Sequence, residues 1–315
     1  MIYRPLGRTG LDVSVLSFGA SSLGGVFHDI DESQGVRTVH EVLDLGINFI
    51  DVSPYYGLTK AEAVLGRALR EIDRDRYILA TKVGRYGEKS VDFDFSAARV
   101  KASVDESLAR LGVDHVDLIQ CHDIEFASFD VVMNEAIPAL REVVAEGKAR
   151  FIGVTGLPLT VFTKTIDRLG PEGFDTILSY CHYALNDTTL LPVARDFTEK
   201  GIGVINASPT GMGLLTERGA PAWHPAPESI KAACNEAVAL CKARGQQITD
   251  LAITYAVSEP SIATTLVSSA NPANMRKNIA AAEAELDHEL LADVQRVLEP
   301  VINQTWPSGE PEYAA

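Results

Sequence analysis

The sequence GINFIDVSPYYG, residues 46–57, combines a short apolar strand with the loop that follows it. Residues 47–52 are rich in β-branched side chains and lie between a glycine and a Ser-Pro pair, which is typical of a buried parallel strand. Asp51 stands near the end of this strand, where a charge in an apolar run needs a partner or a function. Tyr56 follows in the loop. A reaction centre at the mouth of a barrel fits this pair, and so does a turn-capping Asp beside a loop aromatic.

Similar apolar strands recur along the chain and alternate with helical patterns. We expect eight strands: one near Val15 and others at 49–52, 77–83, 116–121, 151–155, 176–181, 203–207 and 263–267. Helical patterns between them cover 33–45, 60–70, 97–111, 129–146, 159–169 and 189–199. Eight βα units in 315 residues indicate an α/β fold, a (β/α)8 TIM barrel. An open doubly wound sheet would need a GxGxxG loop after its first strand, and GASSLGG at 19–25 does not match it.

The segments outside the βα units fit a single domain over residues 1–315. Residues 1–14 predict an N-terminal β-hairpin that covers one end of the barrel. A loop rich in glycine and proline starts at Ser208 and precedes a helix at 230–244; Trp223 in this loop either walls a pocket or packs onto the surface. Extra C-terminal helices are expected at 271–284 and 288–298, followed by a loose tail at 303–315.

The composition narrows the classes of partner. A formal net charge of −15 repels phosphate backbones and argues against nucleic acid, leaving a small neutral substrate as the favoured ligand. The chain shows neither a membrane span nor a signal peptide, so we expect a cytoplasmic protein. Four scattered cysteines without CxxC spacing indicate reduced, structural thiols. Cys121-His122 and Cys181-His182 make a metal site conceivable, but no carboxylates stand at ligand spacing, and we expect no metal.

Chemistry-bearing residues gather at consecutive strand ends. Asp51 ends the second strand with Tyr56 in the loop beyond it, Lys82 lies at the third strand end, and His122 at the fourth. Barrel active sites are assembled at the carboxyl ends of the strands, so these four side chains are expected to meet. Each alone has an ordinary structural explanation as a salt-bridge partner or a core residue. Together they predict a proton-transfer site.

A phenol has a pKa of ~10, which is too high for an efficient base near neutral pH. The ammonium of Lys82 is expected to favour the phenolate of Tyr56 and lower its pKa. Asp51 would hold Lys82 in place. His122, as a neutral imidazole, would orient the substrate oxygen.

The chain resembles the aldo-keto reductases, whose pattern of Asp, Tyr, Lys and His matches Asp51, Tyr56, Lys82 and His122. The matching strings are LGRTGLDVSVLSFG at 6–19, DVSPYYG at 51–57, LGVDHVDLIQCH at 111–122 and GKARFIGVTG at 147–156. Four further strings, HDIEF at 122–126, ILSYCHY at 177–183, NDTTLL at 186–191 and GLLTERGAPAWHP at 213–225, resemble its aldose-oxidising members. This resemblance implies substrate contacts from His122, Asp123 and Trp223.

The resemblance also implies a nicotinamide cofactor along the later strand ends. The expected contacts are Thr155, Ser179 (or its neighbour Tyr180), Ser208, Thr210, Gly211, Met212, Ser268, Ser269, Asn274 and Asn278. Ala207 replaces the Tyr that often stacks on the nicotinamide in this family. Ser268 and Asn274 replace the Lys and Arg that clamp a 2′-phosphate in many members, which favours NAD over NADP. Arg276 lies close enough in sequence to compensate.

The implied function is an NAD-dependent sugar 1-dehydrogenase. It would oxidise the anomeric carbon of L-galactose, or of a related aldose such as L-fucose, to the aldonolactone, with Tyr56 as general base. One alternative is an NADPH-dependent aldehyde or ketone reductase. Another is a non-catalytic, cofactor-binding regulatory subunit, which the intact set of four residues disfavours. The oligomeric state, monomer or homodimer, the anomer and the lactone ring size stay open.

Overall fold

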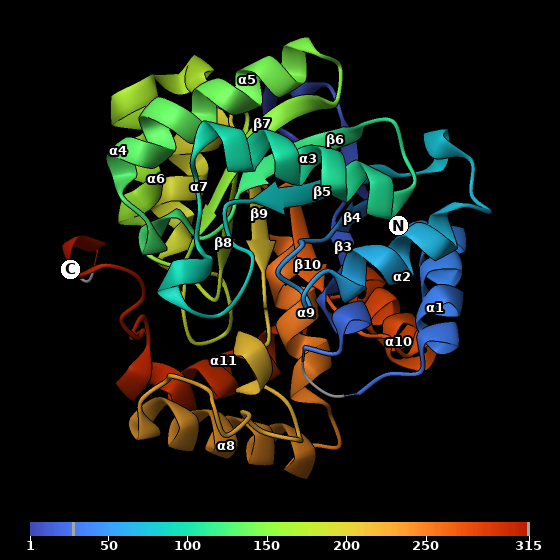
Figure 1. Ribbon diagram of the computed structural model, residues 1–315. Coiled ribbons are helices and arrows are strands. Elements are labelled where there is room, and N and C mark those ends of the chain that lie inside the picture. Colours follow the sequence, from blue (N-terminus) through green and yellow to red (C-terminus); the bar gives the residue numbers. More distant parts are fainter. Residues whose placement is uncertain (27–28, 314–315) are drawn as a thin grey trace.

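The computed structural model describes residues 1–26 and 29–313. Its central feature is a closed barrel of eight parallel strands in the order β10-β3-β4-β5-β6-β7-β8-β9 (Figure 1). Every pairing inside the barrel is parallel. The strands are β3 (Leu16–Gly19), β4 (Phe49–Asp51), β5 (Ile78–Val83), β6 (Val116–Cys121), β7 (Ala149–Gly156), β8 (Thr176–Tyr180), β9 (Gly203–Ala207) and β10 (Thr264–Val267). The predicted TIM barrel is confirmed, with strand ends within about two residues of those expected.

Helices surround the barrel and follow the predicted pattern closely. They are α1 (Glu32–Asp44), α2 (Lys60–Leu69), α3 (Ala97–Leu111), α4 (Phe129–Val131), α5 (Ile137–Ala145), α6 (Thr160–Leu169), α7 (Leu190–Glu199), α8 (Glu228–Ala243), α9 (Ile248–Ser258), α10 (Pro272–Glu283) and α11 (His288–Leu298). The expected helix at 129–146 is continuous but contains a π-helical turn between α4 and α5. Helices α8 and α11 pack together outside the ring of βα helices (Figure 1).

Sequence patterns missed helix α9. Its sequence ITDLAITYAVS buries residues on nearly every side, from Ile248 and Leu251 to Val257. A helix that is apolar all round lacks the stripe of period 3.6 by which amphipathic helices are recognised. It supplies the helix of the βα unit that joins β9 to β10.

The N-terminal hairpin pairs β1 (Tyr3–Pro5) with β2 (Asp12–Ser14) and closes the end of the barrel where the strands begin. Leu6 is fully buried against the lumen-facing residues Phe49, Leu118 and Leu178. A Cβ at Gly7 would lie 2.3 Å from the backbone nitrogen of Gly203, so only glycine permits this approach. With that end sealed, the carboxyl ends of the strands form the accessible mouth.

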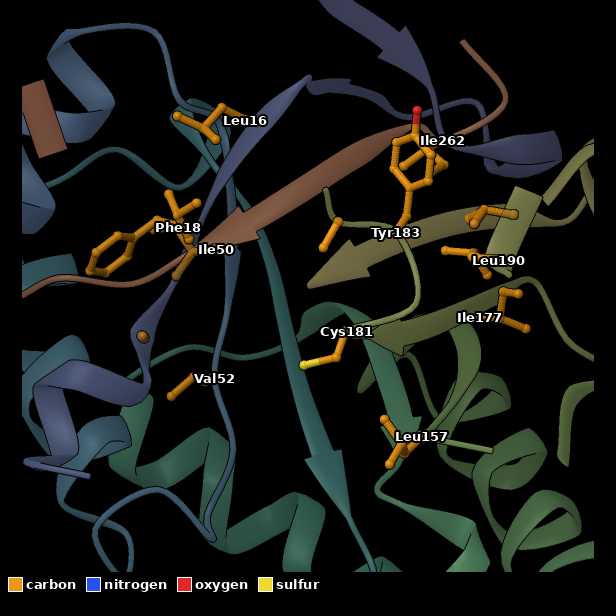
Figure 2. Packing of buried hydrophobic residues seen from close by; sticks show 14 of the residues in the cluster. Leu16, Phe18, Ile50, Val52, Leu157, Ile177, Cys181, Tyr183, Leu190 and Ile262 are labelled. Atoms are coloured by element: carbon orange, nitrogen blue, oxygen red, sulfur yellow. The ribbon is translucent and has the colours of Figure 1, made fainter. Parts of the chain in front are cut away.

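A larger apolar cluster fills the layer between the barrel and its helices. Figure 2 shows part of it, with Leu16 and Phe18 of β3, Ile50 of β4 and Ile177 of β8. Residues next to one another in these strands therefore face opposite layers, one toward the lumen and one toward the helices.

The C-terminal segment differs from the loose tail that we expected at 303–315. Trp306 and Tyr313 are 7% and 1% exposed, and Asn303 accepts a hydrogen bond from the backbone of Thr188. The expectation of a loose tail was wrong because buried aromatic side chains hold this segment. A sequence rich in Pro, Gly and Glu does not reveal that burial. Residues 314–315 lie outside the described part of the chain.

Candidate active site

The residues at the barrel mouth follow from the alternation of side chains along each strand. Apolar strand residues face the lumen below the mouth, among them Phe49, Ala80, Leu118, Leu178, Ile205 and Leu266. Because strand side chains alternate between the two faces, every second residue toward the carboxyl end faces the lumen as well. This alternation leads to Asp51, Lys82, Gln120, Tyr180, Ala207 and Ser268.

Asp51, Lys82 and Tyr56 form a continuous chain of polar contacts. Lys82 Nζ makes an ion pair with Asp51 Oδ1 and also donates to Val52 O at 3.0 Å. The same ammonium lies 3.4 Å from the phenol oxygen of Tyr56. The side chains of Lys82 and Asp51 are 1% and 3% exposed, so their charges depend on one another for stabilisation.

Gln120 of β6 fixes the other oxygen of the carboxylate. Its Nε2 donates to Asp51 Oδ2 at 2.8 Å, which satisfies both oxygens of Asp51 within the barrel. We did not select this residue from the sequence. Its signal was available, because a glutamine inside the fully buried strand VDLIQC requires a polar partner.

Close backbone packing sets the position of the Tyr56 loop. A Cβ on Gly57 would lie 2.1 Å from the carbonyl oxygen of Gly24, and one on Gly24 would lie 2.6 Å from that of Tyr56. Leu58 and Thr59 continue the loop with left-handed backbone, at φ 50° and 75°. Such conformations persist only where the surrounding structure requires them, so the phenol is held by a rigid loop.

Ser53 orients the imidazole of His122. The serine Oγ lies 2.9 Å from His122 Nδ1 and accepts a hydrogen bond from the backbone of Tyr55. Its own hydroxyl proton is thereby available to Nδ1, which favours the tautomer with the proton on Nε2. The rings of Tyr55 and Tyr56 meet the imidazole edge-on, with centroids 5.9 and 5.8 Å away. Ser53 is a second residue that sequence reasoning missed.

Burial controls the protonation states. Burial lowers the pKa of His122 well below its usual value, despite Asp123 nearby, so the imidazole is neutral. Burial also raises the pKa of Tyr56, and the opposing effect of Lys82 is smaller. Lys82 thus lowers the pKa of Tyr56 as expected, but burial outweighs it, and the net pKa lies above that of a free phenol. Burial opposes the charge of Lys82, but Asp51 and Tyr56 outweigh it and raise the pKa of the ammonium.

Asp123 follows His122 in left-handed backbone, with φ 51°. Its backbone N–H donates to Thr155 Oγ1 at 2.9 Å, and that hydroxyl donates to Asp123 Oδ1 at 3.1 Å. The structure thus ties the hydroxyl of Thr155, expected on the cofactor, to Asp123. Burial opposes ionisation of Asp123, but the pKa is lowered overall, and the charge of Arg85 with the hydrogen bonds from Arg85 and Thr155 favours the carboxylate.

The mouth is open on the side opposite Lys82. The last residues of β3, β8 and β9, which are Gly19, Tyr180 and Ala207, are partly exposed, although the residues before them in each strand are buried. Partly exposed hydroxyl residues continue this side: Ser21, Ser208, Thr210, Ser268 and Ser269. Small residues and neutral hydroxyl donors along four adjacent strand ends fit an extended nucleotide cofactor. The expected contacts Gly211 and Met212 lie in the loop after β9, both with left-handed backbone.

The side chain of Ser179 lies on the face of β8 that is turned away from the barrel mouth. Leu178 faces the lumen, so Ser179 faces the helices and Tyr180 faces the mouth. Ser179 is fully buried, whereas Tyr180 is partly exposed and lies within electrostatic reach of Asp123. The sequence strings left Ser179 and Tyr180 as alternatives, and the alternation selects Tyr180.

The start of α10 groups the residues expected at the adenosine end. Ser269 accepts hydrogen bonds from Asn271 N and, at 3.3 Å, from Asn274 Nδ2. Asn278 Nδ2 lies 3.8 Å from the sulfur of Met275. Ser268 Oγ accepts from Ser22 N at 2.9 Å, which joins β10 to the loop after β3.

Arg276, which could have replaced the missing basic clamp, forms an ion pair with Glu41 of α1. A guanidinium already paired with a carboxylate is a weaker ligand for phosphate.

Trp223 lies at the surface with 55% of its area exposed. Its ring stacks on the buried His224, whose Nε2 contacts Gly211 O at 3.0 Å and whose ring meets Trp306 edge-on. Of the two expectations, packing onto the surface describes this residue better than a pocket wall. Its contact with a substrate stays a prediction.

Glu125 anchors the C-terminal segment close to the mouth. Its Oε1 accepts hydrogen bonds from Leu157 N at 3.0 Å and Ser308 Oγ at 3.2 Å. A Cβ on Gly309 would lie 2.3 Å from the carbonyl oxygen of Glu125, so glycine is required there. Burial, reinforced by Asp123, raises the pKa of Glu125 to about 8.

Replacing Glu125 with Gln should remove a loss of stability at alkaline pH. A group whose pKa is raised in the folded state contributes stability below the unfolded value of ~4.3, and this is lost as pH rises toward the folded value. We expect Glu125→Gln and the parent to have similar free energies of unfolding at pH 5. At pH 8.5 the free energy of unfolding of the variant should be higher by on the order of a few kcal/mol. Glu310→Gln, an exposed change on the same segment, is the control. If the stability of Glu125→Gln and of the parent changed with pH in the same way, Glu125 would not be protonated in the folded protein.

Within the described ranges 1–26 and 29–313, no cluster of three or more His, Cys, Asp or Glu could hold a metal ion. Within the same residues, no helix has the length and apolar character needed to cross a membrane.

Comparison with known proteins agrees with this geometry. The model of the aldo/keto reductase family matches residues 15–299. The chain is 52% identical to L-galactose dehydrogenase of Arabidopsis thaliana over 312 residues, which cover 97% of each chain. It is 33% identical to D-arabinose 1-dehydrogenase of Saccharomyces cerevisiae, covering 78% of this chain and 76% of the relative. Among solved structures, the holo form of an aldo-keto reductase from Bacillus halodurans superposes with a TM-score of 0.78, at 27% identity and full coverage of both chains.

Proposed function

Because this chain belongs to the aldo/keto reductase family and is an oxidoreductase, we propose that it oxidises the anomeric carbon of L-galactose with NAD, giving the aldonolactone. The observation that carries the proposal is the 52% identity to L-galactose dehydrogenase over nearly the whole of both chains. The contacts among Tyr56, Lys82 and His122 provide the chemistry that such an oxidation needs.

Oxidation of a hydroxyl removes a hydride from carbon and a proton from oxygen. The nicotinamide, when bound, accepts the hydride. Tyr56 takes the proton, and Lys82 stabilises the phenolate that makes this possible. His122 donates from Nε2 to the reacting oxygen and holds it beside the phenol. Asp51 positions Lys82, and Gln120 holds the carboxylate of Asp51.

An NAD preference is supported by the charges at the start of α10. Ser268 and Asn274 carry no charge, and Arg276 is paired with Glu41. NADP would place a dianionic phosphate near Ser268 and Asn274, which carry no charge to pair with it. Tyr180, Ser208, Thr210 and Ser269 are the residues that we propose to contact the cofactor.

We further propose that the substrate is a small aldose, like those named for the relatives. The net charge of −15 argues against nucleic acid as a partner. A cytoplasmic location is supported by four free, buried cysteines, since thiols stay reduced in that compartment. Both the monomer and the homodimer are compatible with the proposed activity.

A panel of sugars measured with both cofactors tests the function. L-Galactose, L-fucose and D-arabinose share one configuration at three consecutive hydroxyls, and D-galactose is the mismatched control. We expect NADH formation to be fastest with L-galactose and kcat/KM to be about 10-fold or more lower with NADP, the cost of one unmatched charged group. Faster NADPH-driven reduction of simple aldehydes would identify a general reductase instead. A stable partner protein without any turnover would identify a regulatory subunit.

A further inference from the structure

Arg85 has no part in the reaction described above, yet it is one of the most constrained side chains at the mouth. It follows β5 three residues after Lys82, and its guanidinium carbon lies 3.7 Å from the ring centroid of Tyr55. The rings of Phe93 and Phe126 flank it at 5.3 and 5.8 Å. A planar guanidinium held among aromatic rings keeps one orientation, which suits it to positioning another group.

The group that Arg85 positions is the carboxylate of Asp123. Arg85 Nη1 makes an ion pair with Asp123 Oδ2, while Thr155 donates to Oδ1. The two side chains are 18% and 6% exposed. Since the charge of Arg85 and the hydrogen bonds from Arg85 and Thr155 favour the carboxylate and its pKa lies below the usual value, Asp123 is ionised. An ionised carboxylate only accepts hydrogen bonds, and with two oxygens it has acceptor capacity beyond these contacts.

The position of Asp123 beside His122 indicates which further hydrogen-bond donor its carboxylate can bind. Its Oδ2 lies 3.7 Å from His122 Nε2, which is too far for a direct hydrogen bond. His122 Nε2 is the donor that the proposed function assigns to the oxygen undergoing oxidation. A hydroxyl donor beside that oxygen would therefore reach Asp123.

In a pyranose, only two oxygens stand next to the anomeric hydroxyl. One is the ring oxygen, which has no proton to donate. The other is the hydroxyl on C2. A carboxylate beside the reacting oxygen can therefore bind the C2 hydroxyl and not the ring oxygen.

We propose that Arg85 is a specificity-determining residue, which holds Asp123 as the acceptor for the hydroxyl on the carbon next to the one oxidised. The site then selects 2-hydroxy aldoses over substrates that lack this hydroxyl. The inference rests on the proposed function and adds the substrate group that the mouth recognises. Arg85 acts through Asp123 and so is a positioning residue.

The test compares L-galactose with 2-deoxy-L-galactose in the parent and in Arg85→Met. Methionine keeps much of the apolar packing against the rings but cannot pair with Asp123. We expect the variant to lose about 10- to 100-fold in kcat/KM for L-galactose, the range for one charge-assisted hydrogen bond. The loss for 2-deoxy-L-galactose should be several-fold smaller, so the preference between the two sugars falls. Arg85→Lys, which keeps the charge, should restore part of the preference.

Arg99→Met is the matched control, because Arg99 also stacks on a tyrosine, Tyr86, and pairs with a carboxylate, Glu106, within helix α3. It should leave the preference between the two sugars unchanged. Equal losses on both sugars in Arg85→Met would show a purely structural role and overturn the inference. A parent protein that oxidises both sugars equally well would also overturn it, while leaving the proposed function intact. A parent that oxidises no aldose with either cofactor would contradict the proposed function and this inference together.

Discussion

Replacing Tyr56 with Phe is expected to lower kcat for sugar oxidation by about 10³-fold, within the usual range for loss of a general base. The substitution removes one oxygen, which lies 3.4 Å from Lys82 Nζ. The ring contacts with His122 and Tyr55 are unchanged by the loss of that oxygen. Cofactor binding should therefore stay within about threefold of the parent, since the phenol oxygen is not among the proposed cofactor contacts.

The pH dependence of the parent provides a second readout of the same group. Burial raises the pKa of Tyr56, so only a small fraction is phenolate at neutral pH. Oxidation by the parent should speed up as pH rises, because the base is the deprotonated form. The residual activity of Tyr56→Phe should lack this rise. The matched control is Tyr55→Phe, which keeps the neighbouring ring and should preserve the pH profile. A Tyr56→Phe variant with more than a tenth of parental kcat would rule out Tyr56 as the base.

The fold could be predicted almost completely because the strands carry a strong periodic signal. Eight apolar runs separated by helical patterns determine a closed barrel, and ends such as Val116–Cys121 and Gly203–Ala207 match to the residue. Helix α9 escaped because it is buried on most sides, which removes the amphipathic stripe. The C-terminal segment escaped because its order depends on contacts with Glu125, 183 residues away in sequence at Ser308.

The site could be predicted only as far as strand ends could be assigned. Asp51, Lys82 and His122 follow from the ends of β4, β5 and β6, and the structure brings them together with Tyr56. Ser179 and Tyr180 remained alternatives, since a shift of one residue in a strand moves a side chain to the opposite face. Gln120 and Arg85 were missed because their importance lies in contacts with Asp51 and Asp123, which sequence spacing does not reveal.

The signs of the pKa shifts were the least predictable property. Lys82 favours the phenolate of Tyr56 as expected, yet burial has the larger effect. How far a phenol is removed from water depends on the whole barrel mouth, including the loop that packs Gly57 on Gly24. Sequence reasoning identified the cation but could not weigh it against desolvation.

Replacing Lys82 with Met is expected to abolish activity and to destabilise the fold, and a second substitution should separate these effects. The change leaves the buried carboxylate of Asp51 without its cation. Removing one partner of a buried ion pair typically costs about 3–5 kcal/mol. Activity should fall by at least about 10²-fold, because nothing then stabilises the phenolate of Tyr56.

The double variant Lys82→Met/Asp51→Asn removes both charges and should recover most of the stability. An asparagine at 51 keeps an oxygen that can accept from Gln120 Nε2, and replacing both members of a buried pair is often nearly neutral. Activity should remain lost, because the double variant still lacks the ammonium. Urea unfolding and kcat measured on the parent, both single variants and the double variant complete the cycle.

A pH series makes the cycle decisive. Burial already raises the pKa of Asp51 in the parent, against the opposing effects of Lys82 and Gln120. Without Lys82 this pKa should rise further. A raised folded pKa means that stability is present below the unfolded value of ~3.9 and is lost as pH increases toward the folded value. Lys82→Met should therefore be close to the parent in stability at pH 5 and far weaker at pH 8, whereas the double variant should lack this trend. If Lys82→Met were as stable as the parent at pH 8, Asp51 would not need Lys82 for its stability. If the double variant regained turnover, Tyr56 would not need Lys82 for its activity.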